Sequence, residues 1–360
     1  MKVVGIFRGF PGLGRVVSGV ETLRIFQKYH NAEISIFSYL QGFEYCKDIF
    51  ETYNIFAEKD ISSIGIIPVS QSGELIIDEI EKNNPDIILI DGEPLLLTTI
   101  KLRFPNIKVI TLLNPFDVEN PHNRLSSQLF FKDCYAKADY AIVHGIWKVE
   151  KPKEFDNNFY SIHTILRSEI LDIQSNKNTN RIACILGGGS VNGSSSFFQN
   201  TLEIAKKAFT VAELYPDFQV DIFCSCEYIF QKVTEYNTFY QNVFIHRELK
   251  KPTEMYSNAK LVLARAGRNT ISELLHLKIP SLLFATSCNI RGSEQYQNLS
   301  SVKQISQGQL LGFDVASLEN LIPNFRISNS LNNNWQWDSG NKDLEYLILK
   351  LQNFLDTLKS

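Results

Sequence analysis

The fold is decided by residues 260–285, which read KLVLARAGRNTISELLHLKIPSLLFA. Its two ends, 260–264 and 280–285, are largely apolar runs, as in strands buried on both faces of a parallel sheet. Between them lie a glycine-containing turn and a helical stretch that starts near Asn269 and Thr270. This order predicts a doubly wound α/β domain, in which ligands bind beyond the carboxyl ends of the strands.

The same alternation of apolar strand, loop and helix runs through the whole chain. In the first half, strands are predicted at 2–7, 33–39, 65–69, 86–91, 108–113 and 140–144, and helices at 16–29, 73–82 and 124–138. In the second half, strands are predicted at 181–186, 219–223, 242–246, 260–264 and 280–285, and helices at 197–215 and 342–358.

The chain is predicted to form two domains. Its 360 residues are too many for one typical core and sufficient for two. Residues 172–180 are polar and have no hydrophobic period, which is typical of a linker. The sequence therefore predicts two Rossmann-like α/β domains. Their expected ranges are 1–170 and 181–340, joined by a linker at 171–180 and followed by a C-terminal helix, 341–360, that packs back on the first domain.

Composition limits the function classes. Hydrophobic residues make up 44% and charged residues 21% of the chain, as in ordinary globular proteins. The net charge of −3 argues against a nucleic-acid partner, which usually requires a basic surface. The six cysteines show no zinc spacing. No signal peptide is visible, and no apolar run approaches the roughly 20 residues of a membrane span. We expect a cytoplasmic protein with at most peripheral contact with a membrane.

A glycine-rich loop follows the first predicted strand and contains Gly9, Gly12 and Gly14. Its spacing is GxxGxG rather than the dinucleotide fingerprint GxGxxG, and no acidic residue ends the second strand at Tyr39. An NAD site is therefore weakly supported. The loop is either a structural turn or part of a substrate cleft.

A second loop, residues 187–193, occupies the same place in the second half and reads GGGSVNG. Gly188, Gly189 and Ser190 would suit an anionic group at a helix N-terminus. The loop lacks the Lys-Ser/Thr ending of nucleoside-triphosphate loops, so ATP hydrolysis is not expected. A flexible turn is the alternative.

The turn after residue 264 offers more specific chemistry. Gly267 permits close approach of a ligand, Arg265 and Arg268 could offset phosphate charge, and Glu273 could accept two hydrogen bonds from a ribose. However, Thr270 and Glu273 also have the spacing of a capping box, which would stabilise the helix start without any ligand. The residues alone leave both possibilities open.

Two further polar segments follow predicted strands. Asp91 and Glu93 end the fourth strand and are candidate general bases, although with Pro94 they could equally begin the next helix. Glu294 and Gln295 begin a later helix and could bind sugar hydroxyls, although a solvated helix start would look the same.

Three consecutive segments carry a resemblance to a known family. They are RAG…TISEL at 265–274, IPSLLF at 279–284 and EQYQN at 294–298. In this order they resemble the donor-binding region of GT-B glycosyltransferases, above all family 28, which includes peptidoglycan N-acetylglucosaminyltransferase. The loop 187–193 resembles the G-G-S-x-G loop of the same families. The resemblance implies two domains that face each other across a cleft.

The resemblance also implies an activity, namely inverting transfer from a UDP- or dTDP-linked sugar without a bound metal or other cofactor. Glu273 would hold the ribose, and Gln295 the transferred sugar. The backbone near Gly267, Arg268, Asn269 and Thr270 would meet the diphosphate together with that of 188–190. The segment around His246 and Arg247 would flank the base.

The chain departs from the family pattern at two points. Residues 8–15 contain no histidine, which the family often uses as general base, so Asp91 or Glu93 is the hypothesised base. The usual glutamine pair is Glu294-Gln295 here, which leaves the donor sugar open. The acceptor is equally open: a small molecule, a glycolipid or a cell-wall precursor. A nucleotide-sugar epimerase or hydrolase and a non-catalytic binding protein are the alternatives.

Overall fold

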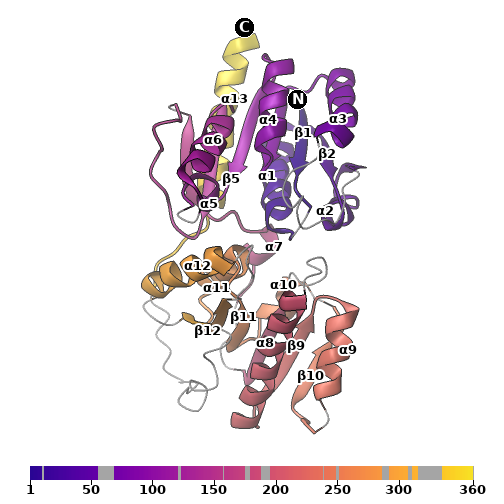
Figure 1. Ribbon diagram of the computed structural model, residues 1–360, viewed down its shortest axis with the longest axis vertical. Helices are drawn as coiled ribbons and strands as arrows, with labels where there is room; N and C mark the ends of the chain where they lie inside the picture. The colour runs from indigo at the N-terminus through magenta and orange to yellow at the C-terminus, as the bar shows by residue number, and fades with distance from the viewer. Residues whose placement is uncertain are drawn as a thin grey trace. The chain divides into compact units, whose positions relative to one another are not determined.

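A computed structural model describes residues 1–9, 12–55, 69–120, 123–156, 158–174, 179–187, 195–237, 239–248, 251–285, 292–306, 310–314 and 335–359. The chain divides into two compact units. The first unit consists of Met1–Arg167 and Ser339–Ser360, and the second of Ser168–Asp338. Each unit contains one parallel sheet with helices packed on it (Figure 1), which confirms the predicted α/β class.

The sheet of the first unit has seven strands in the order β3-β2-β1-β4-β5-β6-β7, all paired in parallel. The strand order reverses between β1 and β4, which lie next to each other at the centre. The strands are β1 (Lys2–Phe7), β2 (Glu33–Ser38), β3 (Glu51–Asn54), β4 (Ile87–Asp91), β5 (Lys108–Leu113), β6 (Tyr140–Gly145) and β7 (Phe159–His163).

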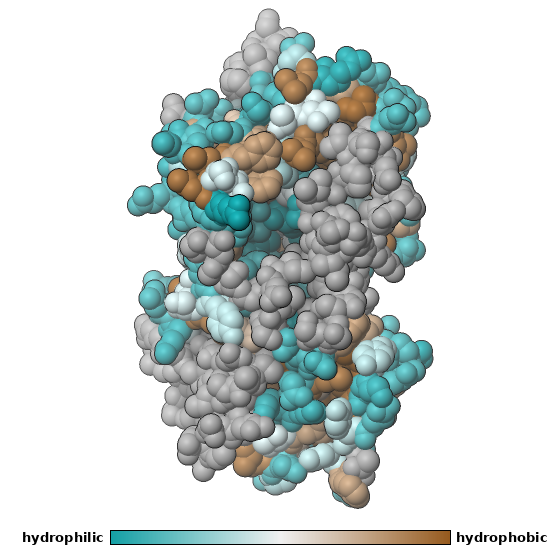
Figure 2. Space-filling view, viewed as in Figure 1, coloured by the Kyte–Doolittle hydropathy of each residue, from teal (hydrophilic) through white to brown (hydrophobic). Residues whose placement is uncertain are grey.

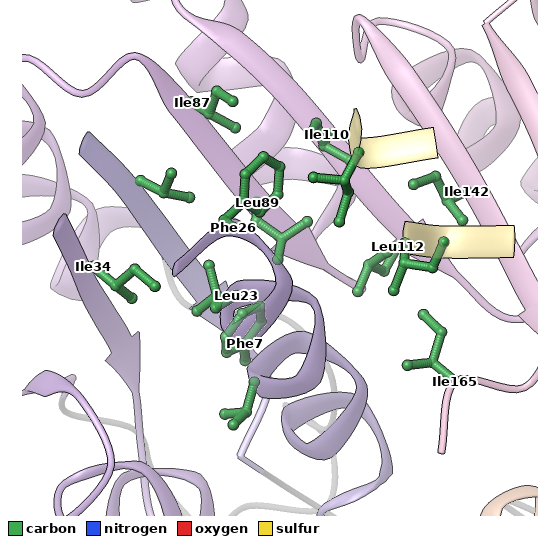
Figure 3. Close-up of a cluster of buried hydrophobic side chains, with 14 of the residues drawn as sticks. Phe7, Leu23, Phe26, Ile34, Ile87, Leu89, Ile110, Leu112, Ile142 and Ile165 are labelled. Atoms are coloured by element: carbon green, nitrogen blue, oxygen red, sulfur yellow. The ribbon is translucent and has the colours of Figure 1, made fainter. Parts of the chain in front are cut away.

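Helix α1 shows why these sequences fold as they do. Its residues Val16, Val20, Leu23 and Phe26 recur at helical spacing and are all buried. They pack in one cluster with strand side chains such as Leu89 (Figure 3). The helices of this unit are α1 (Gly14–His30), α2 (Gln41–Cys46), α3 (Val69–Asn83), α4 (Pro94–Arg103), α5 (Pro115–Val118), α6 (Leu125–Tyr135) and α13 (Asn341–Lys359).

The C-terminal helix α13 belongs to the first unit and lies beside α1 (Figure 1). The Asn341 side chain donates to the carbonyl of Leu166 at 2.7 Å and accepts from its N–H at 2.9 Å. Glu345 pairs with Lys28 of α1, and Leu344 joins the hydrophobic cluster of the sheet. These contacts fix the helix on the first domain although it follows the second in sequence.

The sheet of the second unit has six strands in the order β10-β9-β8-β11-β12-β13, again all parallel. Its order reverses between β8 and β11. The strands are β8 (Arg181–Leu186), β9 (Gln219–Cys224), β10 (Val243–His246), β11 (Leu261–Arg265), β12 (Ser281–Ala285) and β13 (Leu310–Asp314). The helices are α7 (Ser168–Leu171), α8 (Ser195–Leu214), α9 (Glu227–Tyr236), α10 (Pro252–Tyr256), α11 (Arg268–Leu277) and α12 (Gly292–Ile305).

Most predicted elements agree with the structure to within a few residues. The predicted strand 65–69 lies outside the described residues except for Val69, which begins α3, so that helix starts four residues earlier than expected. Strands β3, β7 and β13 were not predicted. The boundary between the units falls between Arg167 and Ser168, just before the polar run 172–180, of which residues 175–178 lie outside the described part.

Candidate functional site

In each sheet the strand order reverses at one place, where ligands of open α/β sheets bind beyond the strand ends. In the second unit this place is the carboxyl edge of β8 and β11, whose residues Ile185 and Ala264 are paired. The glycine loop after β8 and the Gly267 turn after β11 therefore begin side by side. Gly188, Gly189 and Ser190 lie outside the described residues, and Gly187 is the last described residue before them.

The turn at Gly267 is held from three sides. Its N–H donates to the carbonyl of Arg265 at 2.8 Å, and Ala266 N–H donates to the carbonyl of Phe284 at 2.9 Å. The side-chain amide of Asn298 donates to the carbonyl of Ala266 at 3.1 Å. Among the described residues, no heavy atom lies within 4 Å of a Cβ built on Gly267. The backbone at Gly267 is thus fixed in position and accessible to a ligand.

Helix α11 begins earlier than the capping-box alternative requires. Its first residue is Arg268, its N-cap is Gly267, and no side chain caps it. The first helical bond already runs from Ile271 N–H to the Gly267 carbonyl at 3.0 Å. Thr270 is therefore the third residue of the helix and cannot be its N-cap, and Glu273 lies in the second turn. The capping-box interpretation of Thr270 and Glu273 is wrong.

The first turn of α11 points its backbone N–H groups toward the strand edge. The first N–H groups of a helix have no acceptor within the helix, and they carry a partial positive charge. Here they belong to Arg268, Asn269 and Thr270, directly after the Gly267 turn. The Arg268 guanidinium donates from Nε to the Asn269 side chain at 3.3 Å. These donors suit an anionic group at the switch point, the place where the strand order of the sheet reverses.

Glu273 presents a buried carboxylate one turn further along α11. Its exposed fraction is 4%, and the Tyr256 hydroxyl of α10 donates to its Oε2 at 2.8 Å. The neighbouring Ile271, Leu274 and Leu275 are fully buried in the core and fix the helix to the sheet. The carboxylate is thus held in place on the same helix whose first turn faces the switch point.

Arg265, the last residue of β11, connects that strand to the end of β8 and to α8. Its guanidinium donates from Nη1 to the Gly187 carbonyl at 3.4 Å and from Nη2 to the Thr201 hydroxyl of α8 at 2.5 Å. Thr201 is fully buried. These contacts make Arg265 part of the wall that holds β8, β11 and α8 together, and its role in offsetting phosphate charge stays a prediction.

The other sequence candidates of this unit lie along the same edge. Gln295 and Glu294 are in the first turn of α12, and Gln295 is largely buried. Arg247 follows β10, three strand spacings or roughly 14 Å from β11, and pairs with Glu227 at 2.5 Å. The ring nitrogen Nε2 of His246 forms a hydrogen bond with Oδ1 of Asp221 at 2.6 Å. The structure therefore places Gln295 near the start of α12, the helix whose Asn298 contacts the Gly267 turn, and leaves Arg247 at the far end of the edge.

The switch point of the first unit holds a cluster of arginines and carboxylates. Arg15 of α1 pairs with Asp91 at 2.5 Å and with both oxygens of Asp117 at 2.8 and 2.9 Å. Arg8, directly after β1, pairs with Glu93 at 3.2 Å and also donates to the carbonyl of Gly92. We call Arg8, Arg15, Asp91, Glu93 and Asp117 the arginine–carboxylate cluster.

The cluster is largely buried, and two of its carboxylates are almost entirely removed from solvent. Asp91 and Glu93 are each 1% exposed. Burial lowers the pKa of Arg15, but Asp117 and Asp91 outweigh it and hold that pKa well above its ordinary value. Burial raises the pKa of Asp117, yet the charge and hydrogen bonds of Arg15 bring it below its ordinary value. Arg15 therefore stays charged and cannot serve as a base, a role that only the carboxylates of the cluster can fill.

The turn between β4 and α4 explains how both carboxylates reach the arginines. Gly92 adopts φ +77°, which favours glycine, and the Arg15 guanidinium packs against it. Pro94 is the first residue of α4, as the capping alternative requires, and Glu93 occupies the N-cap position. However, the Glu93 side chain makes no capping hydrogen bond. The carboxylates thus bind arginines rather than cap the helix.

The glycines of the first loop have different roles. A Cβ on Gly9 would overlap the carbonyl oxygen of Tyr39, so packing alone requires glycine there. A Cβ on Gly12 would have no described heavy atom within 4 Å. Gly14 is the first residue of α1. For Gly9 the structural explanation therefore suffices, whereas Gly12 leaves room for a ligand.

The sequence did not identify several residues that build the two sites. They are Arg8, Arg15, Asp117, Thr201 and Tyr256. Arg8 and Arg15 immediately flank the first glycine loop, and arginines at that position beside a D-x-E turn were an available signal. Thr201 and Tyr256 are ordinary helix residues, and only the tertiary structure shows their contacts. Asn298 belongs to the predicted segment 294–298, but its contact with Ala266 was not predicted.

Comparison with known proteins shows which family the second unit is similar to. Residues 183–333 match the Glycosyltransferase family 28 C-terminal domain. Two curated relatives are named UDP-N-acetylglucosamine–N-acetylmuramyl-(pentapeptide) pyrophosphoryl-undecaprenol N-acetylglucosamine transferase. The protein from Lachnospira eligens is 30% identical over 99 residues, 28% of this chain and 27% of its own length. The protein from Clostridium kluyveri is 27% identical over 205 residues, 52% of this chain and 50% of its own length. The matches thus span between a quarter and a half of these relatives.

Solved structures share the fold over nearly the whole chain. MurG from Acinetobacter baumannii aligns with a TM-score of 0.62 and 14% identity, covering 97% of this chain and 100% of that one. The glycosyltransferase VinC in complex with dTDP aligns with a TM-score of 0.59 and 11% identity, covering 96% and 94%. The chain therefore has the GT-B fold, its residues 183–333 match the C-terminal domain of glycosyltransferase family 28, and it resembles the glycosyltransferases of that family.

Proposed function

We propose that this protein is a glycosyltransferase that moves a sugar from a nucleotide diphosphate sugar to an acceptor. The observation that carries the proposal is the buried carboxylate of Glu273 on α11. It follows a helix N-terminus and the accessible Gly267 turn, within the segment that matches family 28. A carboxylate can accept hydrogen bonds from two ribose hydroxyls, and the helix start can bind a diphosphate. The site thereby offers partners for the ribose and for the diphosphate of the donor.

The donor is a UDP- or dTDP-linked sugar. The curated relatives are named for UDP-N-acetylglucosamine, and VinC was crystallised with dTDP. Gln295, largely buried near the start of α12, would contact the transferred sugar together with Glu294. Gly188, Gly189 and Ser190 would complete the diphosphate site, and Arg247 would flank the base.

The reaction proceeds with inversion and without a metal, and a carboxylate of the arginine–carboxylate cluster removes the acceptor proton. Glu93 is the preferred base, because its contact with Arg8 is 3.2 Å, whereas Asp91 lies 2.5 Å from Arg15. A close guanidinium stabilises the charged carboxylate and so weakens it as a base.

Separate replacement of the two carboxylates tests this assignment. Glu93→Gln should lower kcat by two to four orders of magnitude, the usual contribution of a general base, while Asp91→Asn should act mainly through stability. Full activity of both variants would refute a base in this cluster.

The acceptor is proposed to be a lipid-linked or cell-wall precursor, since the names of the curated relatives specify an undecaprenol-linked acceptor. Among the described residues no helix has the length and hydrophobicity to cross a bilayer. Hydrophobic side chains nevertheless gather on the surface of the first unit (Figure 2). Those on α4 and α6 are Leu102, Leu125, Leu129 and Phe130, with the basic Arg103 and Arg124 next to them in sequence.

We propose that this surface contacts an anionic membrane peripherally, as hydrophobic side chains beside basic ones can do. Co-sedimentation with anionic vesicles should decrease for Leu125→Glu and with increasing salt. Unchanged sedimentation of the variant would remove the membrane role from this surface.

The whole proposal is tested by incubation with UDP- and dTDP-linked sugars and an extract from the source cell, with the products analysed by mass spectrometry. Transfer should appear as an acceptor heavier by one sugar, should continue in EDTA, and should give the inverted anomer by NMR. Free sugar or an epimerised donor as the sole product would instead indicate a hydrolase or an epimerase. Absence of any nucleotide binding would refute the proposal.

A further inference from the structure

Tyr256 is a buried residue at the end of α10 that contacts the proposed ribose ligand Glu273. We infer that Tyr256 is a positioning residue that fixes the Glu273 carboxylate for the two neighbouring hydroxyls of a ribose. Of the two proposed donor classes, it therefore favours UDP-linked sugars over dTDP-linked ones, whose deoxyribose lacks the 2′-hydroxyl. The inference rests on the proposed function, and it adds a residue that acts through Glu273 rather than on the nucleotide itself.

The carboxylate needs such a partner because of its own flexibility. The terminal torsion of a glutamate side chain is broad and roughly twofold, so the plane of an isolated carboxylate is poorly defined. The Tyr256 hydroxyl donates to Oε2 at 2.8 Å and so selects one orientation. A carboxylate offers about four acceptor sites, so it can accept from a phenol and from ribose hydroxyls at the same time.

Tyr256 is itself held firmly enough for this task. Its side chain is 1% exposed, and Met255 and Ala259 around it are also buried. Its backbone carbonyl accepts from Ala259 N–H at 3.0 Å, which closes the turn after α10. Helix α10 in turn packs against β8 and α7. The phenol cannot swing away without opening this part of the core, so its direction sets that of the carboxylate.

Burial makes the orientation matter more. Glu273 is only 4% exposed, so hydrogen bonds to it compete weakly with bulk water. A ribose hydroxyl that meets a fixed carboxylate pays no cost for ordering it, which is the general basis of preorganised binding. Loss of the phenol should therefore weaken the binding of nucleotides that use both hydroxyls. Nucleotides that use neither should be unaffected.

The test measures the dissociation constants of UDP, 2′-deoxy-UDP and 2′,3′-dideoxy-UDP by calorimetry for the full chain and for Tyr256→Phe. The variant removes one oxygen and keeps the ring packing. We expect about a tenfold loss of UDP affinity, which corresponds to about 1.4 kcal/mol, and no change for dideoxy-UDP. The preference for UDP over 2′-deoxy-UDP should shrink accordingly. In turnover, KM for the donor should rise with little change in kcat.

Tyr240→Phe is the matched control. Tyr240 donates to Glu213 at 2.8 Å, the same distance, but this pair is exposed and precedes β10, away from the strand ends that form the site. The control should bind all three nucleotides like the unmodified protein.

Three outcomes would overturn the inference. An equal loss for all three nucleotides, or failure of Tyr256→Phe to fold, would show that the hydroxyl has a general structural role. Unchanged affinity for UDP would show that the carboxylate needs no positioning. Absence of UDP binding by the unmodified protein would instead refute the proposed function itself, and the inference with it.

Discussion

Replacement of Arg15 by methionine should be among the most destabilising single substitutions in the first unit. Arg15 is the shared partner of Asp91 and Asp117, and its side chain is 12% exposed. Methionine has a similar length but no charge, so the variant leaves two largely buried carboxylates without this counter-ion. Removal of one partner from a buried ion pair typically costs about 3–5 kcal/mol. For a domain of 150–250 residues this lowers Tm by about 6–20 °C.

The assay is thermal and urea unfolding of the full chain, followed by circular dichroism. Lys28→Met provides the control, because Lys28 lies on the same helix α1 and pairs with Glu345 at 3.2 Å, but is 66% exposed. Exposed pairs contribute about 0–1 kcal/mol, so this variant should change Tm by only a few degrees.

A double substitution separates the ion pair from simple packing. Arg15→Met combined with Asp117→Asn removes one of the two uncompensated charges and should recover part of the loss. If Arg15→Met costs less than about 1 kcal/mol, or if the double variant is additive, then the cluster does not stabilise the fold through its charges.

Two other predictions concern acid stability and the second site. Because the pKa of Asp117 is lowered by folding, its contribution is present above its unfolded pKa of about 3.9 and is lost as pH falls through the folded value. Below about pH 4 the free energy of unfolding should therefore decrease less steeply with falling pH in Asp117→Asn than in the unmodified protein. The same slope in both proteins would contradict this. Thr201→Val removes the hydroxyl that accepts from Arg265, and should raise KM for the donor several-fold with little change in kcat, whereas Thr201→Ser should behave like the unmodified protein. Equal values for both Thr201 variants would exclude a role for that hydrogen bond.

The central strands were predictable because their signal is local. Runs such as 87–90 and 261–264 are apolar throughout, as in strands buried on both faces of a parallel sheet. Strands β3 (Glu51–Asn54) and β7 (Phe159–His163) lie at the edges of the sheet and are half exposed. Their mixed composition carries no clear period, so sequence patterns could not distinguish them from loops.

The positions of the site candidates were predictable where they follow a predicted strand, and their contacts were not where these depend on packing. Gly267 and Glu273 follow β11, so the strand prediction placed them in the turn and the helix after that strand, while their part in binding stays a prediction. The start of α11 was misplaced because Thr270 and Glu273 fit the capping-box spacing, whereas the tight turn at Gly267 already begins the helix at Arg268. Tyr256 contacts Glu273 from another helix, and a local sequence pattern cannot predict a contact between two helices.

Both units use an arginine to bridge their switch point, and this has a consequence for charge at the proposed donor site. In the first unit Arg15 spans from α1 to the end of β4 and to α5, and in the second Arg265 spans from β11 to the end of β8 and to α8. These acceptors of Arg265 are a carbonyl and a hydroxyl, which are neutral, so its guanidinium keeps its positive charge. In the proposed donor site a diphosphate would then meet the N–H groups at the start of α11 together with the charges of Arg265 and Arg268. The affinity of the site for the donor should therefore fall as the salt concentration rises, and it should also depend on the geometry of the Gly267 turn.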